Sequence, residues 1–147
     1  MSFADDWIRR TRREVNTITE AIFIQVCTRI VVQTPVGDIS TWENKPKDGY
    51  RPGTLANSWF AGIGDPPGGL VSREHNVNAQ ASLADIQATA ESFSGRVAYL
   101  VNPTPYANRA EYLGWPVKGA APYRMVGLTV NEFRQIVDIA VNQRRGR

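Results

Sequence analysis

The single histidine is the first residue to test for chemistry. His75 stands in the polar segment Ser72–Asn78, with no second histidine and no nearby cysteine, so the sequence offers no zinc ligand set. A Ser–His–Asp hydrolase would need Ser58 or Ser72 as its nucleophile, and neither serine stands in a nucleophile-elbow sequence. We therefore expect His75 to be a polar loop residue and the protein not to be an enzyme.

Other motifs of catalysis and cofactor binding are incomplete. Gly62–Ile63–Gly64 lacks the later glycine of a dinucleotide fingerprint, and residues 64–69 lack the Lys-Ser/Thr of a phosphate loop. Glu111 and Asp138 have basic neighbours on expected helices, which favours ion pairing at a surface or interface over acid–base catalysis. The sequence predicts no cofactor and no metal ion. The lone Cys27 lies in an apolar run, so we expect a buried, unreactive thiol.

Arginine dominates the basic residues, with 14 Arg against 3 Lys and a net charge of +3. One basic patch is Arg9, Arg10, Arg12 and Arg13, and the other is Arg144, Arg145 and Arg147. Such patches can neutralise phosphates without reading sequence, or can serve a subunit contact. No helix-turn-helix, zinc-finger or RNA-binding signature accompanies them. We expect the C-terminal three to face a DNA path or a protein partner.

Aromatic residues gather in the expected loops and short elements. Aromatic side chains together with arginines are typical anchors of protein–protein interfaces. We expect Trp59, Phe60 and Tyr99 in the core. The candidate subunit or partner contacts are Trp42, Tyr50, Arg51, Tyr106, Arg109, Glu111, Trp115, Tyr123 and Arg124.

The elements that would position these residues begin with one long helix over residues 2–33. Ser2 and Asp5 have the spacing of a capping box, and Thr34–Pro35 ends the helix. Its second half, from Ala21 onward, is apolar nearly all round and should be central to the core. One apolar stripe runs through Ile8, Val15, Ile18, Ile22, Val26 and Ile30.

Two loops, over residues 36–53 and 64–81, flank the next element. We interpret Thr54–Ile63 as a strand, with a short helix as the alternative. A second helix is expected over Ser82–Phe93, with Ser82 and Asp85 as its capping box, and residues 96–102 favour a central strand.

The last third of the chain predicts two further helices. Thr104 would cap a helix over Tyr106–Leu113 that ends at Gly114. Thr129 and Glu132 would form the capping box of the last helix, with Leu128 and Phe133 as a hydrophobic staple. The basic residues 143–147 would form a tail that is partly disordered.

The chain length suits a single domain, residues 1–147. The longest apolar stretch, Ala21–Val32, contains Gln25, Thr28 and Arg29 and is too short and too polar to cross a bilayer. Asp5 and Asp6 stand where a signal peptide needs a basic region. We expect no membrane partner and assembly in a reducing cytoplasm.

The order of several short motifs resembles the neck or tail-completion family of lambda-like long-tailed double-stranded DNA phages. In the second half they are LVNPTPYA at Leu100–Ala107, then Arg109, Glu111, Tyr112 and Gly114, then APYRMV at Ala121–Val126 before a helix with Phe133. In the first half they are Thr34–Val36 after a long helix and RPGTLANSW at Arg51–Trp59. The resemblance spans most of residues 1–142. The loop from Asp38 to Asp48 and the segment from Gly64 to Asn78 depart from it.

This resemblance implies an α+β fold, with a long N-terminal helix, a small and mostly antiparallel sheet, and two or three further helices including a capped C-terminal one. It implies a virion protein that forms a ring, with six copies expected, between the head connector and the tail tube. Its partners would be copies of itself, the head connector or adaptor, and the tail terminator or tail tube. Genomic DNA would pass through the lumen without being read. The alternatives are a tail terminator that caps the tube and a non-specific DNA-binding packaging protein.

Overall fold

The first helix, α1 (Phe3–Gln33), organises the chain. The computed structural model describes residues 1–37, 51–115 and 119–146. Ser2 caps α1 as the sequence predicts, because its hydroxyl accepts the Asp5 N–H while the Asp5 carboxylate accepts the Ser2 N–H. The Asp5 carboxylate accepts hydrogen bonds from the Ser2 hydroxyl and from the Ser2 N–H, and these bonds hold the pKa of Asp5 below its ordinary value.

The end of α1 is tied to the rest of the molecule. Thr34 leaves the helical conformation, and its hydroxyl donates to the Ile30 carbonyl at 2.7 Å. The same hydroxyl accepts the indole N–H of the buried Trp59 at 2.9 Å. Phe23, Cys27, Ile30 and Val31 are buried on this half of the helix. The expectation that the second half is central to the core is confirmed.

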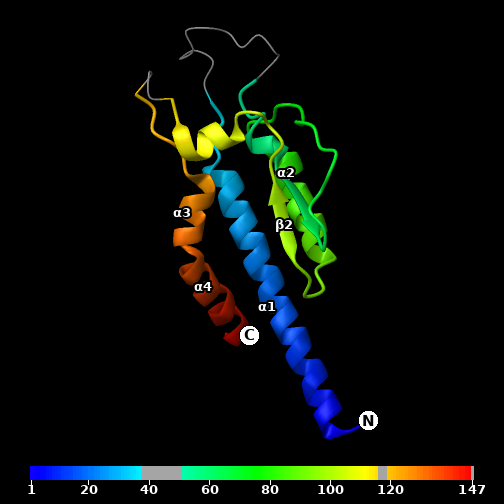
Figure 1. Ribbon diagram of the computed structural model, residues 1–147. Coiled ribbons are helices and arrows are strands. Elements are labelled where there is room, and N and C mark those ends of the chain that lie inside the picture. Colours follow the sequence, from blue (N-terminus) through cyan, green and yellow to red (C-terminus); the bar gives the residue numbers. More distant parts are fainter. Residues whose placement is uncertain (38–50, 116–118, 147) are drawn as a thin grey trace.

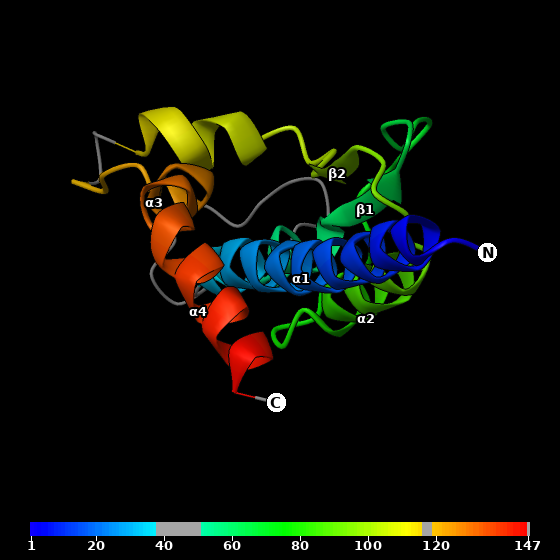
Figure 2. The same cartoon turned by 90° about the horizontal axis from the view of Figure 1, so that it is seen from below.

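The remaining elements pack around that half of α1. They are η2 (Ala56–Ser58), β1 (Phe60–Ile63), α2 (Gln80–Glu91), β2 (Ala98–Val101), η3 (Arg109–Leu113), α3 (Met125–Asn131) and α4 (Phe133–Arg145). Helix α2 contacts both α1 and β1, and α3 and α4 pack on the other side of α1 (Figures 1 and 2). The N-terminal end of α1 projects beyond all of them (Figure 1).

The α+β class is confirmed, with a small antiparallel sheet in the described part of the chain. Strands β1 and β2 pair with Phe60 opposite Val101 and Ile63 opposite Ala98. The expected strand over Thr54–Ile63 divides into the short helical turn η2 and β1, so both interpretations hold for part of it. The prediction that residues 96–102 form a central strand is wrong, because β2 pairs with β1 alone among the described residues.

Two predicted capping boxes are also wrong. Helix α2 begins at Gln80, after Ala79, and the side chains of Ser82 and Asp85 bond to the β1 segment instead. Thr129 lies inside α3, where its hydroxyl donates to the Met125 carbonyl at 2.9 Å. Glu132 stands between α3 and α4 and forms an ion pair with Arg29 of α1. Ser82, Asp85 and Glu132, which the local pattern assigns to helix capping, therefore bond instead to residues distant in the sequence.

One further expectation fails at the start of an element. Thr104 donates its hydroxyl to the Asn102 side chain and does not cap the helix after it. That helix contains the five-residue π-helical turn η3. At the other end of the chain, Arg144 and Arg145 belong to the last turn of α4, where cations interact favourably with the helix dipole.

Gly53 is required by its backbone and its surroundings. Its φ is +89°, and its N–H donates to the Val36 carbonyl at 2.8 Å, next to the end of α1. A Cβ added there would lie 2.6 Å from the carbonyl carbon of Asn76. No side chain can be accommodated unless the main chain moves.

We predict that Gly53→Ala lowers the free energy of unfolding by about 2 kcal/mol or more, because it adds left-handed strain to a backbone clash. Gly68→Ala is the matched control, since nothing lies within 4 Å of its added Cβ. Urea denaturation followed by circular dichroism measures both. Equal stability of the two variants would contradict this account of Gly53.

Candidate interaction surfaces

The predicted contact residues of the second half come together in one unit, which we call the 104–124 module and define by its described residues, 104–115 and 119–124. Arg109 donates from Nε to the Gly114 carbonyl at 3.1 Å and lies 5.6 Å from the ring centroid of Trp115. Trp115 meets Tyr123 edge-on, with 6.4 Å between the ring centroids. The Tyr123 N–H donates to the Ala110 carbonyl at 2.8 Å. Tyr106 packs against the core cluster, and Arg124 is exposed before α3.

Gly114 closes this module. Its φ is +64°, and an added Cβ would lie 2.4 Å from the Ala120 carbonyl oxygen. The backbone of Trp115 pairs with that of Ala120. The exposed side chains beside this closure are Tyr112 at 69%, Leu113 at 66% and Tyr123 at 43%. They form the outward surface of the module.

Glu111 has a different role from the one its sequence position predicts. It is 7% exposed, and its carboxylate accepts the backbone N–H groups of Val126 and Gly127 at 3.0 and 2.9 Å. Both N–H groups belong to the first turn of α3 and have no acceptor within the helix. A negative charge at this end of a helix also interacts favourably with the helix dipole. The expectation of a surface ion pair is wrong, because Glu111 joins η3 to α3 within one chain.

The remaining predicted contacts are placed as follows. Arg51 is exposed, and its backbone N–H and carbonyl bond with the Thr54 hydroxyl. Arg144 and Arg145 are exposed on α4. Trp42, Tyr50 and Arg147 lie outside the described residues.

The arm, which we define as residues 3–15 of α1, is a surface that the interface prediction missed. Every residue of it is exposed. Four apolar side chains point into solvent: Phe3 at 87%, Trp7 at 61%, Val15 at 54% and Ile8 at 44%. Ile8 and Val15 belong to the apolar stripe that continues into the core. The periodicity therefore identified the apolar face of the helix, but it could not show that no other element packs on this part of the face. Arg9, Arg10, Arg12 and Arg13 are the sequence feature that indicates an exposed segment here.

A second exposed apolar surface lies at the junction of α3 and α4. Val130 is 64% exposed, Phe133 48% and Leu128 42%. The predicted staple between Leu128 and Phe133 would have covered both side chains. Ile136 and Ala140, on the inner side of α4, are buried.

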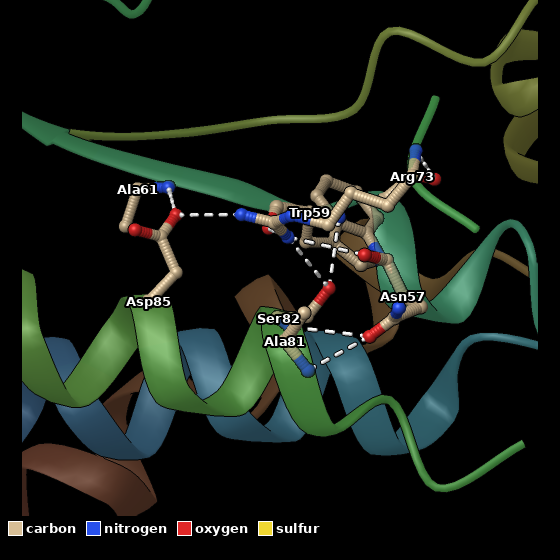
Figure 3. A network of polar contacts seen from close by, with 8 residues as sticks. Asn57, Trp59, Ala61, Arg73, Ala81, Ser82 and Asp85 are labelled. Atoms are coloured by element: carbon tan, nitrogen blue, oxygen red, sulfur yellow. Dashed lines mark hydrogen bonds and ion pairs between the residues drawn. The ribbon is translucent and has the colours of Figure 1, made fainter. Parts of the chain in front are cut away.

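The densest polar cluster in the described chain surrounds Arg73, below β1 (Figure 3). Its guanidinium donates to the carbonyls of Asn57 and Trp59 at 3.1 and 2.6 Å, and contacts Asp85 at 3.3 Å. It also stacks 3.7 Å from the Phe60 ring centroid. Asp85 accepts the Ala61 N–H at 2.7 Å. These bonds hold η2 and β1 onto α2.

Ser58, one of the two serines considered as a hydrolase nucleophile, bonds to the backbone of Arg73 in this cluster. Ser58 is fully buried, with its hydroxyl donating to the Thr54 carbonyl and accepting the Arg73 N–H. The Asn57 side chain accepts the Ala81 N–H at 2.9 Å and so caps α2 from another element. His75 is exposed. Each of these hydrogen bonds therefore holds one segment of the fold against another.

Metal and thiol chemistry have little support in the described part of the chain. Within it, no group of three or more His, Cys, Asp or Glu side chains could hold a metal ion. Burial raises the pKa of the Cys27 thiol to about 12, and the side chain is 3% exposed. The prediction of a buried, unreactive thiol is confirmed.

By length and composition alone, α1 could cross a membrane. Its second half contacts α2, α3 and α4, and Arg29 pairs with Glu132 on that half. The absence of a membrane partner stays a prediction.

Comparison with protein-family models, with curated proteins and with solved structures finds no match to this chain. The motif residues themselves are mostly internal. Asn102 donates to the Leu55 carbonyl, Trp59 to Thr34, and Glu111 caps α3. These bonds hold the fold together, while the motif residues Tyr112 and Tyr123 are exposed.

We predict that Glu111→Gln lowers the free energy of unfolding by about 1–3 kcal/mol, because an amide offers one acceptor where two N–H groups need one each. Glu14→Gln, at an exposed position of the arm, is the control and should change stability by less than about 0.5 kcal/mol. Thermal unfolding compares the variants. A Glu111→Gln protein as stable as the control would show that the α3 cap contributes nothing.

Proposed function

We propose that this protein is a structural component of a tailed-phage particle, which forms a ring at the junction of head and tail and joins the connector to the tail tube. The observation that carries the proposal is the arm. Large apolar side chains along four helical turns have no cover within the described chain. Exposed apolar surface of this kind marks sites of association.

The motif order supports the proposal from the sequence side. The motifs at Arg51–Trp59 and Leu100–Gly114 make the intramolecular bonds that set the fold around α1. A chain that resembles the neck family in those residues has the means to build the same framework. The exposed arm and the outward aromatics of the 104–124 module then supply the contacts with partners.

The expected partners follow from this role. Copies of the chain would form the ring, with the head connector or adaptor on one side and the tail terminator or tail tube on the other. Arg144 and Arg145 are exposed and could line the DNA path. With a net charge of +3, any attraction for the passing DNA is weak.

The decisive genetic prediction concerns particle assembly. Particles made without this protein should show filled heads and tails of normal length that do not join stably. Electron microscopy of the lysate measures both features. Tails of abnormal length would instead identify a tail terminator, and normally joined particles would contradict the proposal.

A binding titration separates the ring protein from a DNA-packaging protein. We expect binding to double-stranded DNA to be negligible at physiological salt and to appear only when the salt is lowered, because few phosphates are neutralised. Filter binding at several salt concentrations measures this. Sub-micromolar affinity with a steep salt slope would favour the packaging alternative.

A further inference from the structure

The uncovered stripe of the arm continues a packed helix face. Ile8, Val15, Ile22 and Arg29 follow one another at seven-residue steps and so share one side of α1. Arg29 contacts Glu132 at the start of α4. Near residue 29, α4 covers this side of α1. The same side continues along the arm, where no described element covers it. A second helix is the shape that fits such a face.

Helix α4 offers a matching strip. Phe133, Val137 and Val141 follow at four-residue steps, beside the line of Ile136 and Ala140 that is buried on its own α1. Phe133 is 48% exposed, and the two valines are half-buried. Helix α4 runs in the opposite direction to α1 of the same chain (Figure 1).

Charges along the two strips define an orientation. Asp5 and Arg12 are seven residues apart on one edge of the arm stripe, and Asp138 and Arg145 are seven residues apart on one edge of the α4 strip. All four are exposed. An antiparallel alignment that pairs Asp5 with Arg145 also pairs Arg12 with Asp138. In a parallel alignment the two charged edges lie on opposite sides of the contact, so these pairs cannot form.

We propose that the arm of one copy packs antiparallel along Phe133, Val137 and Val141 of a second copy. Arg12 then pairs with Asp138 of that copy, and Asp5 pairs with its Arg145. The inference deepens the proposed function and rests on the self-assembly that it requires. Because the arm and α4 are different surfaces, the contact is heterologous. A heterologous contact repeated around an axis is the kind of contact that builds a ring.

The contact between two copies is small. An aromatic side chain buries about 150–250 Å² when fully covered, and Trp7, Ile8 and Val15 are 61%, 44% and 54% exposed, so together they supply roughly 300 Å² on one partner. Counting both partners, this is below the roughly 1,000 Å² of a specific stable interface. One contact alone is weak, and in a closed ring every subunit makes two such contacts.

The test exchanges charges in the full-length protein, with sedimentation velocity over a range of protein concentrations. Arg12→Glu and Asp138→Arg should each weaken self-association by about tenfold or more, because each leaves like charges in contact. The double variant R12E/D138R should restore association to within about threefold of the starting protein. Arg13→Glu, on the opposite side of the arm, is the control and should change it by less than about twofold. Circular dichroism verifies that every variant is folded.

Each other outcome overturns the inference in a distinct way. Association that neither charge change weakens would exclude this contact and leave the proposed ring standing. Weakening by Arg12→Glu but not by Asp138→Arg would show that the arm pairs with another arm, or with a surface other than α4. A starting protein that stays monomeric at every concentration would overturn both the contact and the proposed self-assembly.

Discussion

The structure depends on the packing of η2, α2, α3 and α4 against the second half of one helix, α1. Between about residue 16 and Gln33, α1 contacts α2 and η2 on one side and α3 and α4 on the other, and the Trp59–Thr34 hydrogen bond ties its end to β1. The two-stranded sheet could not be stable by itself and relies on α2. The first half of α1 has the same helical geometry and no such cover within the described chain, so a single helix belongs half to the core and half to an exposed surface.

Two sets of polar contacts attach the remaining elements to the helices that pack on α1. Arg73 and Asp85 hold β1 on α2, and Glu111 holds η3 on α3. Both use buried or half-buried charged groups bonded to backbone donors and acceptors, and such bonds are directional and expensive to leave unmade. They fix where the 104–124 module stands relative to α1. The outward side chains of that module are therefore presented on a rigid support.

Sequence reasoning succeeded where the deciding interactions are local. The Ser2–Asp5 capping box formed because nothing else lies near the N-terminus to compete for those groups. The equally spaced pairs Ser82–Asp85 and Thr129–Glu132 failed because Trp59, Ala61 and Arg29, distant in sequence, take their side chains. The same limit explains Glu111, whose partners lie 15 and 16 residues away. It also explains the missed arm, since periodicity shows which side of a helix is apolar and not where its cover ends.

Hydrogen exchange of the arm tests the central claim that this half-helix is made to be covered by another subunit. A helix segment without tertiary contacts opens readily. In dilute protein, backbone amides of residues 3–15 should exchange much faster than those of residues 23–31. In concentrated protein, the arm amides should become protected while those of the core half stay unchanged. Arm exchange that is fast and independent of protein concentration would contradict the account.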